Sequence, residues 1–202
     1  MTAAPTSPLV AEELAPFAVR RFTVEEYRRM GEIGLLTEED RVELLEGWIV
    51  PKMNRTPLHD ATVELLDDGL RSRLPALWRI RIQSAITAID SEPEPDLAVV
   101  RRDVRSRLSR HPGAHDVALI VEVADTSLRR DRFKVEIYGR AEIPVYWIVN
   151  LIDRRIEVDG EPTGPDTAPG YRRRQDYGPG DSVPLVIGGL EIEQIAVREL
   201  LP

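Results

Sequence analysis

The amino-acid sequence predicts an α/β protein with a mixed central sheet flanked by helices. Segments with apolar residues at helical spacing alternate along the chain with short apolar or polar-apolar runs typical of strands. Proline, glycine and acidic turns separate the two kinds of segment. This interleaving favours a mixed α/β sheet.

Three segments are expected to form helices because their apolar residues recur at helical spacing. They cover residues 24–32, 58–74 and 128–143. Each follows side chains that can cap a helix: Thr23, Thr56 with Pro57 behind it, and the Asp-Thr-Ser turn at 125–127. Glycine or proline breaks each of them, at Gly31 and Gly34, at Pro75, and near Gly139 and Pro144.

The strands are expected between these helices. Residues 41–51 suit a strand or a bent hairpin arm, and residues 78–89 alternate as a half-buried strand does. Nearly continuous apolar runs typical of covered strands occupy residues 95–100, 117–123 and 145–152. We expect residues 154–160 to form a partner strand and residues 101–116 a polar connection with a helical turn. Residues 171–200 are expected to form additional C-terminal strands and a closing helical turn.

Composition describes an ordinary globular protein of 202 residues, with 42% hydrophobic and 31% charged residues. We expect residues 1–20 to be a flexible tail and residues 21–202 to form a single domain. The chain has no cysteine, so any metal must be held by oxygen or imidazole. Its histidines are only His59, His111 and His115.

The sequence indicates no membrane segment and a cytoplasmic location. No apolar run approaches the ~20 residues needed to cross a bilayer, and the N-terminus lacks the pattern of a signal peptide. The net charge of -8 argues against a protein that coats nucleic acid through its overall field. Arginine clusters at 101–110, 129–132 and 172–174 could meet phosphates locally or simply form solvated faces.

One lysine stands out in an arginine-rich chain. Of 27 basic residues only Lys52 and Lys134 are lysines. A compact ammonium differs from a planar guanidinium in hydration, geometry and ease of pKa shift, so Lys134 could mark a site that requires it. The alternative is an exposed helix residue without chemistry.

Two carboxylates, Asp96 and Glu122, favour a functional role for Lys134 over the exposed alternative. Glu122 lies inside the apolar run 117–123, where an ionised carboxylate is costly unless it is paired or binds a cation. Asp96 opens a neighbouring apolar run in the same way. Two carboxylates at adjacent strand ends repel each other, and Mg²⁺, which takes one or two carboxylates and keeps several waters, would relieve the repulsion. The backbone carbonyl of Val123 could add a third ligand.

The helix after Glu122 carries Lys134, and the spacing places Asp131, Lys134 and Tyr138 on one helix face. If the start of that helix packs over the strand end, the ammonium reaches the carboxylate pair. With an ordinary pKa near ~10.4 it would act as a cation rather than as a general base. An ion pair between Glu122 and Lys134 without chemistry is the alternative.

The order Pro95-Asp96 followed by Glu122 in a second apolar strand resembles the PD-(D/E)XK nuclease superfamily, which has the restriction-endonuclease-like fold. A more detailed match is to its Uma-two-type family of endonucleases. The match is carried by FTVEEYRRM, RVELLEGWIV, TPLHDATVELL, EPDLAVV, LIVEV and RRDRFKVEIYGRAEIPVYWIV, and it runs from about Phe22 to Val158.

This resemblance implies a metal-dependent nuclease core in which Asp96 and Glu122 bind Mg²⁺ or Mn²⁺ and Lys134 is catalytic. In the simplest superfamily pattern the lysine stands two residues after the acid, but here that position is Ala124. The resemblance places the lysine on the next helix instead. It also implies that Glu43 is a metal or water ligand, the alternative being an exposed charge on a strand or turn. His59 matches a family histidine at the start of a helix, where capping or packing is the alternative role.

The leading hypothesis is therefore hydrolysis of a phosphodiester bond in DNA by an endonuclease that is expected, by the same resemblance, to form a homodimer. A rival hypothesis is a non-catalytic binding or interaction module that keeps the fold. A metal-dependent hydrolase of another phosphate ester would share the site. The sequence leaves the preferred DNA structure and the biological process open.

Overall fold

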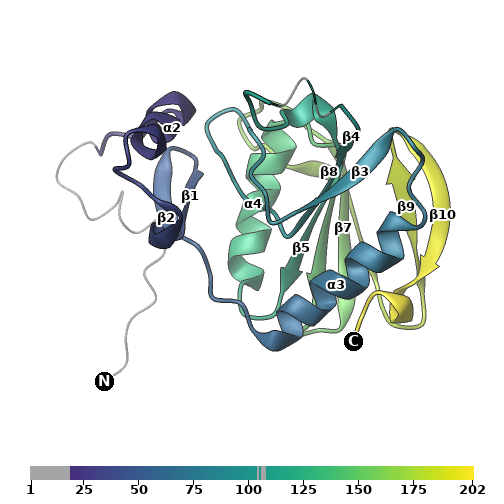
Figure 1. Ribbon diagram of the computed structural model, residues 1–202. Coiled ribbons are helices and arrows are strands. Elements are labelled where there is room, and N and C mark those ends of the chain that lie inside the picture. Colours follow the sequence, from purple (N-terminus) through teal and green to yellow (C-terminus); the bar gives the residue numbers. More distant parts are fainter. Residues whose placement is uncertain (1–18, 104, 106–107) are drawn as a thin grey trace.

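A six-stranded mixed sheet forms the centre of the computed structural model, which describes residues 19–103, 105 and 108–202 (Figure 1). The predicted tail lies outside the described residues as far as residue 18. The strand order is β3-β4-β5-β6-β7-β8, with β5 parallel to β6 and every other neighbouring pair antiparallel. The strands are β3 (Trp78–Ile82), β4 (Leu97–Arg101), β5 (Val117–Ala124), β6 (Val145–Asn150), β7 (Arg155–Pro162) and β8 (Tyr171–Tyr177).

The three predicted helices are present as α2 (Val24–Glu32), α3 (Pro57–Arg71) and α4 (Leu128–Arg140). Thr23 and Glu26 form a capping box at α2, and the Thr56 hydroxyl accepts a hydrogen bond from the His59 amide at α3. At α4 the N-cap residue is Ser127, one of the three expected candidates, but its hydroxyl donates to the Asp131 carboxylate and caps no amide. None of the helices in the described segments is long and apolar enough to cross a bilayer.

The two faces of the sheet bury separate apolar clusters. Side chains of α3 pack on one face together with the antiparallel pair β9 (Ser182–Ile187) and β10 (Leu190–Ala196) (Figure 1). Side chains of α4 cover the other face. Because strand residues alternate between faces, Val121 and Val123 of β5 point to the α3 side, and Ile120 and Ala124 to the α4 side. Glu122 therefore points toward α4.

Residues 41–51 form both arms of a hairpin, whereas the sequence predicted a strand or a single bent hairpin arm there. Its arms are β1 (Val42–Leu45) and β2 (Trp48–Pro51), and Figure 1 shows the hairpin beside α2 at one end of the molecule. Glu46 and Gly47 both take positive φ values in the two-residue turn, 49° and 76°. A Cβ at position 47 would also overlap Arg21, so glycine is required there.

The predicted strand over residues 78–89 is too long, because β3 ends at Ile82. Gln83 takes a positive φ of 45°, and its amide donates to the carbonyl of Asp96 at 3.0 Å, which turns the chain out of the sheet. The amides of Ile86 and Thr87 then bond to loop carbonyls rather than to a strand ladder. Alternating polarity does not report this exit, since it records side chains and not backbone partners.

Short 3₁₀ turns complete the chain: η1 (Glu38–Asp40), η3 (Ala114–Asp116) and η4 (Val197–Glu199). The last two supply the helical turns expected in the polar connection and at the C-terminus. Residues 104, 106 and 107 of that connection lie outside the described part of the chain.

Candidate active site

Asp96, Glu122 and Lys134 meet at one end of the central sheet. Asp96 directly precedes β4, Glu122 lies in the neighbouring strand β5, and Lys134 reaches across from α4. The Lys134 ammonium donates to Oε1 of Glu122 at 2.8 Å, and the Asp96 amide lies 3.3 Å from Oε2 of Glu122. The Asp96 carboxylate accepts a bond from the Val123 amide through Oδ2, at 2.8 Å. The structure thus brings the predicted triad together.

Glu122 and Lys134 are each only 4% exposed. A charge buried to this degree is tolerated when it is paired and hydrogen-bonded. The hydroxyl of Tyr138 donates to Oε1 of Glu122 at 3.0 Å, so two donors from α4 converge on a single carboxylate oxygen. The expected common helix face of Asp131, Lys134 and Tyr138 is therefore turned toward the sheet.

Glu43 reaches the same place from β1. Its Oε1 accepts a bond from Arg130 at 2.8 Å and lies 3.6 Å from the Lys134 ammonium, and its Oε2 accepts from the Glu94 amide at 3.1 Å. Arg130 also donates to the carbonyl of Pro51 in β2. The hairpin is consequently fastened to the start of α4 by charged contacts at the site, and Glu43 is not the exposed charge that a turn residue would be.

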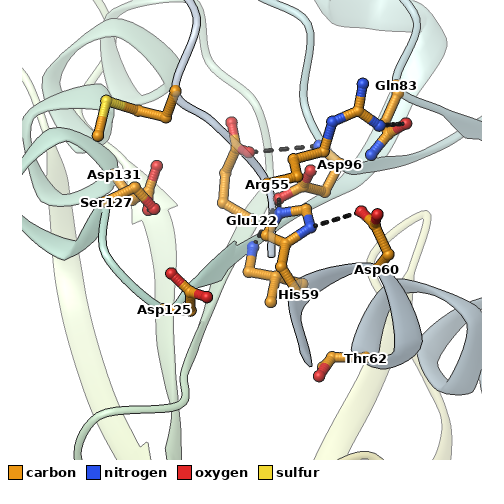
Figure 2. A network of polar contacts seen from close by, with 12 residues as sticks. Arg55, His59, Asp60, Thr62, Gln83, Asp96, Glu122, Asp125, Ser127 and Asp131 are labelled. Atoms are coloured by element: carbon orange, nitrogen blue, oxygen red, sulfur yellow. Dashed lines mark hydrogen bonds and ion pairs between the residues drawn. The ribbon is translucent and has the colours of Figure 1, made fainter. Parts of the chain in front are cut away.

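His59, in the first turn of α3, lies between two carboxylates (Figure 2). Its Nε2 is 3.1 Å from Oδ2 of Asp96, and its Nδ1 is 3.2 Å from Oδ1 of Asp60. Burial by itself lowers the pKa of the imidazole, but the bonds and charges of Asp96 and Asp60 outweigh it and raise that pKa. His59 therefore orients the Asp96 carboxylate from the side of α3.

Several residues at the site were not assigned a role from the sequence. Asp131 is 3% exposed and accepts a hydrogen bond from Ser127 at 2.5 Å, and Arg130 holds Glu43. The spacing had placed Asp131 and Tyr138 on the face of Lys134, but it gave no sign of what they would contact. Tyr138 contacts Glu122 of β5, and Arg130 contacts Glu43 of β1, which is distant in the sequence.

The electrostatics of the site favour a protonated lysine. Burial alone lowers the pKa of Lys134, yet the charges of Glu122, Glu43 and Asp131 reverse this effect and raise the pKa above its usual value. Lys134 therefore remains a cation at neutral pH and has no lone pair with which to act as a base.

Two carboxylates of the site, Glu122 and Asp131, have too little positive charge nearby to offset burial. Burial raises the pKa of Glu122 to about 8 despite the attraction of Lys134, and burial likewise raises the pKa of Asp131 to about 6. For Asp96, burial also acts to raise the pKa, but the contacts with His59 and the Val123 amide prevail and lower it. In Glu43 the charges of Lys134 and Arg130 likewise overcome burial and lower the pKa. An additional cation would let Glu122 ionise.

The predicted ligands surround a cavity of about 90 Å³, enough for an ion with a few waters. Asp96, Glu122 and Val123 line it together with Glu43, His59 and Lys134. Nowhere in residues 19–103, 105 and 108–202 do three His, Asp or Glu side chains form a metal cage. A pair of carboxylates is nevertheless the donor set that suits Mg²⁺, which retains waters and uses substrate oxygens. The residues present thus fit this ion.

A larger groove of about 1120 Å³ borders the cavity. Four residues line both spaces: Arg41, Lys52, Gln83 and Glu94. The groove walls also carry Arg28, Arg81 and Arg110, with Glu32, Glu38 and Glu92 among them. Its polar lining connects the site to the surface between η1 and the loop after β3.

Comparison with known proteins identifies a matching sequence family and a solved structure with a similar fold. A sequence model of the Uma2 family, described as "putative restriction endonuclease", matches residues 24–197. No curated protein sequence matches the chain.

A crystal structure from Anabaena variabilis ATCC 29413, described as a "putative nuclease belonging to DUF820", has a similar fold. The superposition gives a TM-score of 0.65, with 16% sequence identity over 89% of this chain and 97% of that chain. At this identity the likeness shows a shared fold, and it agrees with the predicted restriction-endonuclease-like core.

Proposed function

The chain belongs to the Uma2 family, and from this premise we propose that it is a metal-dependent endonuclease that hydrolyses phosphodiester bonds in DNA. The observation that carries the proposal is the meeting of Asp96, Glu122 and Lys134 around one cavity. A fold retained only for binding has no need to bury an Asp-Glu-Lys set that costs desolvation energy.

Asp96 and Glu122 would hold Mg²⁺ or Mn²⁺, with the Val123 carbonyl as a further candidate ligand. When bound, the ion supplies Lewis-acid charge and lowers the pKa of water in the site. Lys134 presents a buried ammonium, kept protonated at neutral pH by its raised pKa, that stabilises negative charge as it develops on the phosphate. His59 holds one oxygen of Asp96, and the pair of Arg130 with Glu43 keeps the hairpin against α4.

The bordering groove supports a polymeric substrate. A small phosphate ester would need only the cavity of about 90 Å³, whereas a strand that extends on both sides of the scissile phosphate requires a longer channel. Arg41 and Lys52 line both spaces and can meet phosphates next to the one that reacts. DNA is the substrate we infer on this basis together with the family.

Supercoiled plasmid with Mn²⁺ or Mg²⁺ provides the test. The wild type is expected to nick or linearise the plasmid, whereas Asp96→Ala and Lys134→Ala are expected to leave it intact. Arg71→Ala is the matched control, because Arg71 is exposed and pairs only with Asp67 along α3 among its recorded contacts. Absence of cutting by the wild type on duplex, single-stranded and branched DNA, with no metal binding by calorimetry, would refute the proposal.

We also propose a homodimer, by the family resemblance, so that two sites cut two strands. Light scattering of the purified protein tests this: a monomeric mass at micromolar concentration, with and without DNA, would contradict it.

A further inference from the structure

Tyr138 shares one oxygen of Glu122 with Lys134. It lies one helical turn after Lys134 in α4 and is fully buried. Its hydroxyl donates to Oε1 of Glu122 at 3.0 Å, and the Lys134 ammonium donates to the same oxygen at 2.8 Å. A carboxylate oxygen offers two lone pairs, so the two donors together satisfy Oε1.

The other oxygen of Glu122 is left for a ligand. Its recorded contact in the described residues is a long one, the Asp96 amide at 3.3 Å. Asp96 shows the same division, because Oδ2 receives both the Val123 amide and His59. Each carboxylate of the pair is therefore held through one oxygen and offers the second.

Lys134 alone would hold Glu122 less firmly. Its ammonium is also 3.6 Å from Oε1 of Glu43, so it divides its charge between two carboxylates at the end of a flexible four-carbon stem. Tyr138 has only two side-chain torsions, and its ring packs edge-on against Tyr146 with centroids 4.8 Å apart. The Tyr146 hydroxyl donates to the backbone carbonyl of Asp131 at 3.0 Å and makes no recorded bond to Glu122.

We propose that Tyr138 is a positioning residue that fixes the orientation of Glu122 so that Oε2 is presented to the divalent cation. This inference rests on the proposed function, since it concerns the cation bound by the same site. It assigns Tyr138 no contact with substrate. Its effect passes through Glu122, as partners behind a metal ligand set the direction of that ligand.

The test compares Tyr138→Phe with Tyr146→Phe. Both changes remove one buried hydroxyl and keep the ring, and the two rings touch, so their costs in folding should be similar. Only the first change removes a bond to Glu122. Urea unfolding followed by far-UV circular dichroism establishes that each variant is folded before metal is added.

Mn²⁺ alone is the probe, measured by calorimetry and by loss of the free-ion electron paramagnetic resonance signal. Tyr138→Phe is expected to weaken Mn²⁺ binding by about tenfold or more, the usual effect of losing such a supporting bond, while Tyr146→Phe stays within about twofold of the wild type. Plasmid cleavage should show the same split, with Tyr138→Phe needing more Mn²⁺ but recovering most of its rate at saturation.

The outcomes separate this inference from the proposed function. If the wild type binds Mn²⁺ and cuts DNA but Tyr138→Phe matches Tyr146→Phe in Mn²⁺ affinity, the positioning role is wrong and the nuclease stands. If the wild type neither binds Mn²⁺ nor cuts, both fall. A Tyr138→Phe protein whose Mn²⁺ affinity is normal but whose rate at saturating Mn²⁺ is low would also overturn the inference, because the defect would lie elsewhere.

Discussion

Lys134 is held in a charged pocket that suits an ammonium. Glu122 binds it directly, and Glu43 and Asp131 raise its pKa further. A guanidinium has a wide planar head with five donors, and it needs more space and more acceptors than a buried ammonium does. The rarity of lysine in this chain is therefore matched by surroundings in which arginine would fit poorly.

Substitution of Lys134 tests both its charge and its shape. Lys134→Met removes the cation, and Lys134→Arg keeps it in a bulkier form that should displace Glu122. We expect both variants to lose cleavage activity by about 100-fold or more, measured in single turnovers at saturating Mn²⁺. Wild-type activity in Lys134→Arg would show that charge alone suffices, and wild-type activity in Lys134→Met would remove the ammonium from the mechanism.

At this scale the sequence was informative where a residue broke a local pattern. Glu122 interrupts an apolar strand and Lys134 interrupts a series of arginines, so both could be selected from the chain alone. Arg130 and Asp131 break no pattern, because charged residues are ordinary on a helix. The role of Arg130 depends on its contact with Glu43, which is distant in the sequence. The contact of Asp131 with Ser127, four residues earlier, is local, but the burial of Asp131 at the site is not visible in the sequence.

Among the elements, α4 contributes most to the site, because it supplies Arg130, Asp131, Lys134 and Tyr138. Its far end packs closely on the chain before β8: a Cβ at Gly139 would overlap the backbone of Gly170. Only glycine allows this approach. The position of α4 against the sheet, and with it the reach of Lys134, therefore depends on Gly139.

Gly139→Ala should lower the free energy of unfolding by about 2–3 kcal/mol, since backbone must move to admit the methyl group. Gly31→Ala is the matched control within α2, where a Cβ would meet nothing within 4 Å. There alanine should stabilise by about 0.5–1 kcal/mol through helix propensity. Urea titration measures both, and an unchanged midpoint for Gly139→Ala would contradict the close packing.

Strand β7 carries two acidic residues with opposite behaviour. Burial acts to raise the pKa of Glu157, but Arg132, Asn150 and Arg174 outweigh it and lower that pKa to about 2. Burial raises the pKa of Asp159 to about 6, and its Oδ2 has no hydrogen-bond partner in the described structure. Arginines from the clusters at 129–132 and 172–174 are thus engaged with Glu157 rather than only with solvent.

Asp159→Asn should reveal the cost of that buried charge. Between the unfolded pKa of 3.8 and the folded pKa of about 6, the unfolded chain releases its proton first, so wild-type stability falls as pH rises and stays lowered above this range. Asp159→Asn has no carboxyl group to ionise at this position, so its stability does not fall in this way. We expect it to gain about 1 kcal/mol over the wild type near neutral pH, after allowance for solvent screening, and almost nothing near pH 4. Thermal unfolding across pH checks the trend, and a gain independent of pH would contradict it.

The elements themselves were largely predictable, since caps and apolar spacing are local. The helices follow from caps such as Thr23 and Thr56, whereas the two-residue turn at Glu46 and Gly47, which makes residues 41–51 a hairpin, was not recognised in the sequence. The predicted strand over residues 78–89 was wrong beyond Ile82 for a different reason. There the backbone of Gln83 bonds to Asp96, a tertiary contact that leaves the polarity pattern unchanged.

For the whole molecule, the net charge of -8 means that the proposed DNA substrate would be bound against the average field. Many arginines are occupied in the structure: Arg28 binds Glu92, Arg130 binds Glu43, and Arg132 binds Glu157. Few phosphate contacts are then to be expected. The sequence showed the arginine clusters but not these pairs, because the carboxylate partners lie far away along the chain.

Arg41 is the cation we expect to bind a substrate phosphate at the mouth of the site. It lines both the cavity and the groove, it is exposed, and its recorded side-chain bond is a long one to the Met53 carbonyl, 3.4 Å. Its backbone has a positive φ of 48°, an uncommon value for arginine and one often retained at functional sites.

Salt dependence of DNA binding tests this expectation without cleavage, in a protein that carries Asp96→Ala. Each lost phosphate contact lowers the slope of log K against log salt by about 0.7–0.9, so Arg41→Ala should bind more weakly with a shallower slope. Arg71→Ala, which removes the same charge on the exposed side of α3, should leave the slope unchanged. Fluorescence anisotropy with a labelled duplex and a labelled single strand measures both. Equal slopes for the two variants would show that the effect of Arg41 is only one of net charge, and would place the bound strand away from this groove.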